Sequence, residues 1–346
     1  MTYTEAIKSG FGLVNRRLQL VAVQLGMIAI NCIGFFIMVG IPLGIAFIIF
    51  GLDLTGLAEI KDILGIFKNP AELLSKYFGL ILIVISSFLL YILVATTLGL
   101  YVFGGSVGVI GRTLLDPYLK FSMRAFFTEA KKMFFPLMWF SFFMGLIFIA
   151  IAFFLGLFGG GIAAVVSGAK SQDSTLALFL GIFFTLVLAL IALSIILAAL
   201  AVTIYGIAVL FFKGEGSVKT FTGAVKFLWH DQHAFWLYII MFFGYILSSF
   251  ILMLIVYPIK LIPIVGMIIS FPIQILSYVV QSYLGLVMIS VIFIYYFSAE
   301  IKKEEAVPGT PAETIDESSM SVEDISGLQA PAQEEPHPEK DGQGQA

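Results

Sequence analysis

The residues best suited to metal chemistry are two histidines beside an aspartate, in the order His230-Asp231-Gln232-His233. Histidines three residues apart can share one face of a helix, and a neighbouring carboxylate can assist them in binding zinc. A zinc site needs a further strong ligand, and none lies nearby in the sequence. Asp231 as the N-cap of a following helix, with the histidines at a polar–apolar boundary, explains the cluster without metal. The sequence therefore predicts neither a metal site nor a cofactor.

Other residues with catalytic potential have simpler structural interpretations. Asp116 precedes a proline and is typical of a turn, and Glu129 is predicted to pair locally with Lys132. The glycine-rich stretch 104–108 lacks the Lys-Ser/Thr that completes a phosphate-binding loop. Cys32 is the only cysteine, which excludes an intramolecular disulfide. We therefore expect no catalytic residues, no enzymatic activity and no nucleic-acid partner.

Composition defines the elements that carry these residues. The chain has 346 residues, is 60% hydrophobic and only 12% charged, and has a mean hydropathy of +1.04, which is typical of integral membrane proteins. Each of its six uncharged runs exceeds the roughly 20 residues that cross a bilayer core. These runs are Leu18–Leu52, Tyr77–Gly111, Met133–Ala169, Ser174–Phe212, Gln232–Ile259 and Leu261–Ala299. The sequence predicts an all-α protein with six transmembrane helices, a re-entrant break at Gly40–Gly44 being the alternative for the first run.

The distribution of Lys and Arg predicts the orientation. With six spans, thirteen of these residues fall on the side of both termini and five on the opposite side. Because positively charged loops stay in the cytoplasm, both termini are predicted to be cytoplasmic.

An amphipathic segment is expected between spans 2 and 3. Read as a helix, residues 123–134 place apolar side chains on one face and basic ones on the other, which is typical of a helix lying in the headgroup layer. Similar spacings precede spans 1 and 5, so we predict three repeats of a surface helix plus a transmembrane hairpin, at about 1–115, 116–215 and 216–298. The predicted N-caps of the three surface helices are Thr2, with Glu5 three residues on, Ser122 and Ser217. The candidates for contact with anionic lipid are Arg16, Arg17, Arg124, Lys131, Lys132, Lys219 and Lys226.

The C-terminal part has a different composition. Residues 299–346 carry a net charge of −9 and are rich in proline, whereas the rest of the chain carries +6. Such a segment buries too little apolar surface to fold, so we predict a disordered acidic cytoplasmic tail. Val322, Ile325 and Leu328, spaced three residues apart, are candidates for docking a cytoplasmic protein partner; the alternative is that they are incidental apolar residues of a linker.

The predicted spans contain polar residues but no charged ones in their interior. Ion-coupled carriers usually keep a charged residue inside the membrane, so this class is disfavoured. The uncharged polar residues of the spans are expected to form interhelical hydrogen bonds or, alternatively, to line a polar path. They are Gln24, Asn31, Ser86, Ser87, Thr96, Thr97, Ser248, Ser249, Gln274 and Gln281. The pairs Gly40/Gly44, Gly104/Gly108 and Gly156/Gly160 suit close helix packing, with formation of a homo-oligomer as the second reading.

Three stretches resemble known families. They are FGLVNRRLQL (11–20), FSMRAFFTEAKKMFFPLMWF (121–140) and FKGEGSVKTFTGAVKFLW (212–229). Over about residues 2–298 the chain resembles the YciC-like proteins and the membrane domain joined to some glycerophosphodiester phosphodiesterases. No phosphodiesterase catalytic domain is present in this chain, so that activity is not implied. The resemblance implies a six-span protein of the bacterial inner membrane.

These observations favour a non-enzymatic membrane scaffold or accessory protein. Its basic surface is expected to contact anionic lipid, and its tail is expected to recruit a cytoplasmic partner. The alternative is a transporter or channel for lipid-like or small apolar solutes, which would need no buried charge.

Overall fold

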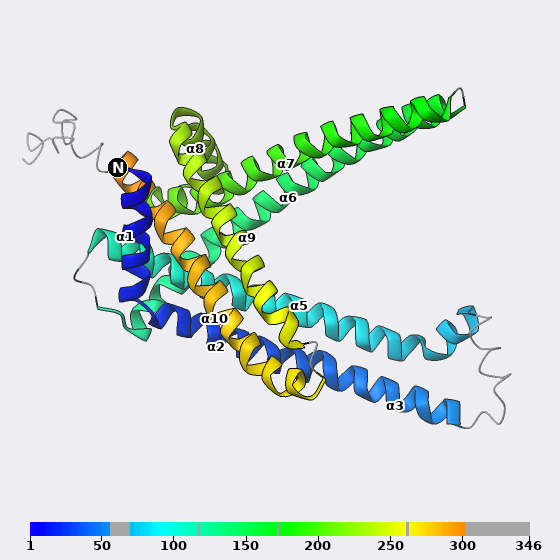
Figure 1. Cartoon of the computed structure of the whole chain (residues 1–346). Coiled ribbons are helices and arrows are strands. Elements are labelled where there is room, and N and C mark those ends of the chain that lie inside the picture. The colour runs from blue at the N-terminus through cyan, green and yellow to red at the C-terminus, as the bar shows by residue number, and fades with distance from the viewer. Residues whose placement is uncertain (56–69, 117, 119, 172, 261–262, 302–346) are drawn as a thin grey trace, which may run out of the picture. The chain divides into compact units, whose positions relative to one another are not determined.

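The computed structural model describes residues 1–55, 70–116, 118, 120–171, 173–260 and 263–301, and all regular structure in these ranges is helical (Figure 1). The contacts divide the chain into a unit Met1–Lys302 and a separate unit Lys303–Ala346. The helices among the described residues are α1 (Tyr3–Arg16), α2 (Gln19–Phe35), η1 (Phe36–Gly40), α3 (Ile41–Thr55), α5 (Pro70–Leu115), α6 (Met123–Lys170), α7 (Ser174–Lys213), α8 (Ser217–His230), α9 (Gln232–Lys260), α10 (Pro263–Tyr296) and η2 (Phe297–Ile301).

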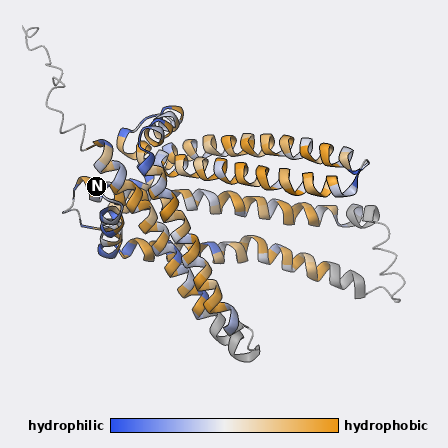
Figure 2. Cartoon of the chain, turned by 45° about the horizontal axis from the view of Figure 1, so that its top comes forward, coloured by the Kyte–Doolittle hydropathy of each residue, from blue (hydrophilic) through white to orange (hydrophobic). Residues whose placement is uncertain are grey.

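Six helical stretches of the described chain are long and apolar enough to cross a membrane. They are Gln19–Ile49, Tyr77–Leu115, Met123–Lys170, Ser174–Lys213, Gln232–Pro258 and Pro272–Ile301. Figure 2 shows the corresponding run of hydrophobic residues along each of these helices. The prediction of an all-helical, multi-pass membrane protein with six spans is confirmed for the described residues.

The first span contains a local distortion instead of a re-entrant loop. η1 is a π-helical turn between α2 and α3, and the Ile41 N–H donates to the Phe36 carbonyl five residues back. The distortion directly precedes Pro42, which has no N–H and whose ring crowds the preceding turn. The widened turn accommodates the proline, and the helical path continues into α3.

Helix starts follow local side-chain chemistry. Thr2 and Glu5 form a capping box at α1, and the Ser122 hydroxyl accepts a 3.1 Å hydrogen bond from the Ala125 N–H at the start of α6, both as their sequence positions predict. At α8 the cap is Gly216, without a side-chain hydrogen bond, and Ser217 is already the first helical residue. The expectation that Ser217 caps this helix is wrong.

The spans pair along the chain. α5 contacts α2 and α3, α6 contacts α7, and α9 contacts α10. α6 and α7 run side by side from one end to the other (Figure 1). Burial is concentrated at one end of each pair: the buried residues of α6 lie between Phe126 and Met144, and those of α7, apart from Ala177, between Leu197 and Leu210. The same core includes buried residues of α1, α2, α5, α8, α9 and α10.

The segment after Ser122 is not a separate surface helix. α6 is continuous from Met123 to Lys170 and runs through Pro136. Three residues of the predicted lipid-facing stripe, Phe126, Ala130 and Met133, are buried in the protein. These three residues therefore pack on another helix instead of facing acyl chains, and the prediction is wrong for them, whereas Met123 and Phe127 of the same stripe are each 54% exposed. The threefold repeat of surface helix and hairpin stays a prediction.

The three residues are buried because α5 has glycines opposite them. A Cβ atom at Gly105 would lie 2.6 Å from the tip of the Phe126 ring, and one at Gly108 would lie 2.6 Å from Glu129 Cβ. Gly104 faces Met133 in the same contact. Because glycine has no side chain, two helix backbones can approach closely at these positions. The Gly104/Gly108 pair thus packs within the chain, as predicted, whereas Gly156 and Gly160 have no neighbour within 4 Å.

Replacing Gly105 by Ala is expected to lower the stability of the protein in detergent by about 1–3 kcal/mol, because the added methyl group would force the buried Phe126 ring to shift. Thermal unfolding of the purified protein measures this effect. Gly156→Ala is the matched control, since the added methyl group meets no other residue. Equal melting temperatures for the two variants would contradict the proposed close packing.

Candidate functional site

The seven candidate lipid-binding residues lie on three helices. Arg16 ends α1 and Arg17 is its C-cap; Arg124, Lys131 and Lys132 lie in the first turns of α6; Lys219 and Lys226 lie on α8. All are exposed except Arg17, which is partly buried. Within the described part of the chain, the six exposed residues form no ion pair. Their charges are therefore available to anions in that part of the molecule.

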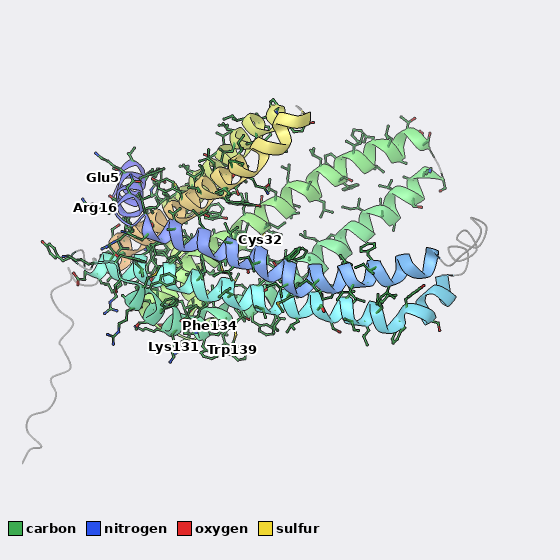
Figure 3. The ribbon with its side chains drawn as sticks, turned by 90° about the horizontal axis from the view of Figure 1, so that it is seen from below. Glu5, Arg16, Cys32, Lys131, Phe134 and Trp139 are labelled. Atoms are coloured by element: carbon green, nitrogen blue, oxygen red, sulfur yellow. The ribbon has the colours of Figure 1, made fainter. Side chains whose placement is uncertain are left out.

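On α6 the exposed face changes from charged to aromatic. Lys131, Phe135 and Trp139 follow one another at four-residue spacing, and Phe142 comes next. The three aromatic side chains are each about 60% exposed. Lys131 and Trp139 are labelled on α6 in Figure 3 and lie about 12 Å apart along the axis at 1.5 Å per residue. This order matches a helix passing lengthwise from headgroups into hydrocarbon.

The tryptophans extend the same pattern to α8 and α9. Trp229, at the end of α8, and Trp236, in the first turns of α9, are both exposed. Tryptophan prefers the boundary between headgroups and acyl chains. The end of the molecule that carries the basic residues therefore has an aromatic border suited to a membrane interface.

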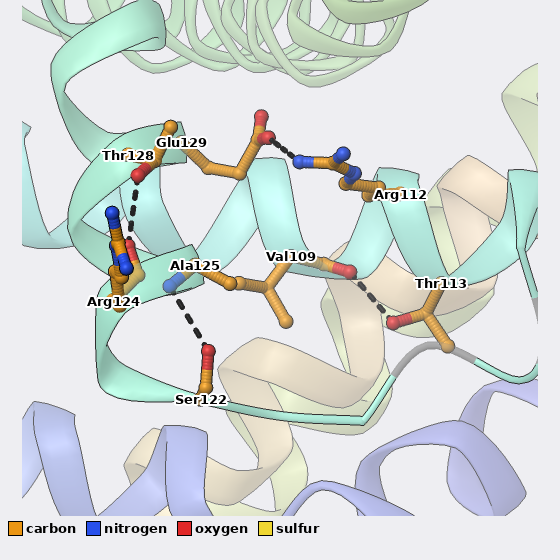
Figure 4. Close-up of polar contacts among 8 residues, drawn as sticks. All are labelled: Val109, Arg112, Thr113, Ser122, Arg124, Ala125, Thr128 and Glu129. Carbon is orange, nitrogen blue, oxygen red and sulfur yellow. Dashed lines mark hydrogen bonds and ion pairs between the residues drawn. The ribbon is translucent and has the colours of Figure 1, made fainter. Parts of the chain in front are cut away.

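A buried carboxylate holds α5 and α6 together. Glu129 is 4% exposed, and its Oε1 accepts a 2.6 Å hydrogen bond from Arg112 Nη1 (Figure 4). The Arg112 side chain is half exposed, so only one of the two charges is removed from solvent. The predicted Glu129–Lys132 pair is wrong: Glu129 points toward α5, where Gly108 leaves room for it, and Lys132 is exposed.

Asp231 organises a second polar cluster. Its Oδ1 accepts from the His233 N–H at 3.1 Å, which confirms that Asp231 caps α9, and its Oδ2 accepts from the Tyr295 hydroxyl at 2.9 Å. The Tyr3 hydroxyl and His233 Nδ1 lie 2.9 Å apart, and the Tyr205 hydroxyl donates to the Ala234 carbonyl at 2.8 Å. The cluster therefore joins α1, α7, α9 and α10.

The cluster does not have the composition of a metal site. The described residues contain no group of three His, Cys, Asp or Glu side chains able to hold an ion. Both Asp231 oxygens already accept hydrogen bonds from protein groups. His230, at the end of α8, is exposed. The arrangement supports a structural role at the junction of four helices.

The three tyrosines of this cluster were missed by sequence reasoning. Their partners lie 230, 29 and 64 residues away along the chain. No local spacing connects such residues, because the contact exists only once the helices have packed. Tyr205 and Tyr295 lie in apolar runs, which marks them as unusual polar groups but does not identify their partners.

The polar residues of the spans lie in two kinds of environment. Gln24 donates to the buried Ser106 hydroxyl at 3.0 Å and joins α2 to α5, as expected of interhelical hydrogen bonds. Others line a pocket of about 260 Å³ between α9 and α10. Its lining consists of Ser249, Leu252, Met253, Val256, Tyr257, Gln274, Ser277, Tyr278 and Gln281. Larger pockets along α6 and α7 are lined mainly by aliphatic and phenylalanine side chains.

Comparison with known proteins identifies no relative. No family model matches the chain, and neither a curated protein nor a solved structure matches it significantly. The resemblance to the YciC-like proteins and to the phosphodiesterase-linked membrane domain stays a prediction.

Replacing Arg112 by Ala is expected to lower the stability of the protein by about 3 kcal/mol, because Glu129 would keep a buried charge without its partner. Glu129→Gln should cost less, since Arg112 can be hydrated at the surface. The double variant should recover part of the loss caused by Arg112→Ala. Thermal unfolding of the three variants measures the coupling, and strictly additive losses would show that the pair contributes nothing.

Proposed function

We propose that this chain is a non-enzymatic membrane scaffold or accessory protein whose basic end binds anionic lipid headgroups and whose acidic tail recruits a cytoplasmic protein. The observation that carries the proposal is the set of six exposed basic side chains without ion-pair partners in the described chain, on α1, α6 and α8. Each such residue near an anionic surface contributes about 1 kcal/mol of attraction.

The lipid contact follows from the direction of α6. Lys131 and Lys132 precede Trp139 by about two helical turns, which places ammonium groups at phosphate level when the indole lies at the interface. The excess of basic residues at this end supports a cytoplasmic location for it and for both termini. We propose the bacterial inner membrane as the location, on the resemblance described above.

The tail forms a unit of its own beyond Lys302. Glu300 still belongs to the helical body, where it lies 3.6 Å from Lys213. Val322, Ile325 and Leu328 lie outside the described residues, so their role as a docking motif rests on sequence alone.

Gly156 and Gly160 of α6 have no other residue close to the position of a Cβ atom, which leaves room for a helix of a second copy of the chain. Formation of a homo-oligomer through this face of α6 is therefore part of the proposal.

Neutralising the α6 charges is expected to reduce binding of anionic lipid. The variant R124Q/K131Q/K132Q should retain several-fold fewer phosphatidylglycerol molecules in native mass spectra, with no change for phosphatidylethanolamine. Lys170→Gln, at the opposite end of the same helix, is the matched control. Unchanged retention of phosphatidylglycerol in the triple variant would overturn the proposed lipid surface.

Changing the tail motif is expected to remove the partner without affecting the fold. The variant V322D/I325D/L328D should lose any stoichiometric protein that co-purifies with the full chain, because charge prevents burial of the apolar positions. Deletion of residues 330–346, which leaves the motif intact, is the control. A partner retained by the triple variant and lost on this deletion would place recruitment in the distal tail instead.

A second candidate function is passage of lipid-like or small apolar solutes. The observation that favours it is the pocket between α9 and α10, where five polar side chains separated in the sequence face one space, together with Tyr257. A lined polar path without charge suits uncharged solutes.

A further inference from the structure

The pocket between α9 and α10 contains hydrogen-bonding capacity that the protein does not use. The Ser249 hydroxyl oxygen is buried and has no hydrogen-bond partner. Gln274 donates to the Tyr278 hydroxyl at 3.1 Å, which uses one of its two N–H groups. Within the described residues, the Gln281 amide makes no hydrogen bond.

These groups lie inside a predicted span. Ser249 follows Trp236 by thirteen residues on α9, which corresponds to about 20 Å along the helix. The hydrocarbon core is about 30 Å thick, so a helix entering near Trp236 places Ser249 in the leaflet away from α1 and α8. Water is scarce there, so an amide or hydroxyl without a hydrogen-bond partner is strongly unfavourable. A polar group from the bilayer would remove this cost.

The lining specifies the chemistry of that group. None of the nine lining residues is Asp, Glu, Lys, Arg or His, so a phosphate or an ammonium would enter without a counter-charge. Amides and hydroxyls both donate and accept hydrogen bonds, which matches a ligand hydroxyl or ester. About 260 Å³ is smaller than a typical pocket for a whole drug-sized ligand, so it suits a headgroup with its chains left in the bilayer. Leu252, Met253 and Val256 provide the apolar side for those chains.

We propose that this pocket binds the glycerol end of an uncharged lipid, a mono- or diacylglycerol. The proposal deepens the second candidate function by naming a ligand class, and it rests on the same pocket but not on passage through it. It is independent of the basic surface, which lies on other helices and selects charged headgroups.

The test uses the full chain in phosphatidylcholine nanodiscs with a diacylglycerol that carries a photoactivatable diazirine on one acyl chain. Saturable cross-linking to α9 and α10 peptides is expected. The variant S249A/Q281L should reduce labelling at limiting probe by about fivefold for each hydrogen bond lost. Ser248→Ala is the matched control, because the adjacent serine is not part of the lining. Unchanged melting temperatures would exclude unfolding as the cause.

Competition decides the ligand class. Unlabelled diacylglycerol should displace the probe, whereas phosphatidic acid with the same chains should not. Equal displacement by phosphatidic acid, or equal labelling of S249A/Q281L and the unchanged protein, would overturn the proposal. Lipid scrambling measured in vesicles separates binding from passage: labelling without scrambling would retain this site and reject the second candidate function. The α6 charge variant should label normally, so failure of the basic-surface proposal would be seen separately.

Discussion

The close approach of α5 to its neighbours is the constraint on which the rest of the described structure depends. Gly105 and Gly108 bring α6 so near that a single added methyl group would collide with Phe126 or Glu129. The same principle applies where Gly111 meets the Phe211 ring of α7 and where Gly206 of α7 meets the Phe140 ring of α6. In a bilayer, apolar side chains gain little by leaving lipid for protein, so such contacts of ring against backbone provide much of the packing energy. The Arg112–Glu129 pair adds an electrostatic link at the same contact.

This packing makes the two ends of the spans different. Near α1 and α8 the helices share one core, and its edge carries the exposed basic and aromatic side chains. Farther along α6 and α7, large apolar residues such as Phe154 and Phe158 are exposed, as lipid-facing residues are. Inside the core, Gln24 binds Ser106 and Tyr295 binds Asp231, although the buried Ser290 hydroxyl oxygen has no partner; in the pocket between α9 and α10 the Ser249 hydroxyl oxygen has none either.

The polar groups of the core stabilise the packing of the helices. Asp231, which lies between the two histidines best suited to metal chemistry in the sequence, uses both oxygens to cap α9 and to bind Tyr295. Tyr3 reaches His233 from α1, so the first helix is attached to the body by a polar contact as well as by Gly10 against Val291.

The sequence by itself determined the class of protein, the six spans, the caps at Thr2, Ser122 and Asp231, and the positions of the exposed basic residues. These follow from composition, hydropathy and spacings of a few residues, which are local properties. The tertiary structure alone decided that Glu129 pairs with Arg112 and that Phe126 faces α5 instead of lipid. An amphipathic pattern predicts that one face of a helix is apolar. It does not tell whether that face packs against the glycines of another helix or against lipid acyl chains, because both are apolar environments. The same holds for Ser249, Gln274 and Gln281, whose shared pocket arises only when α9 and α10 pack together.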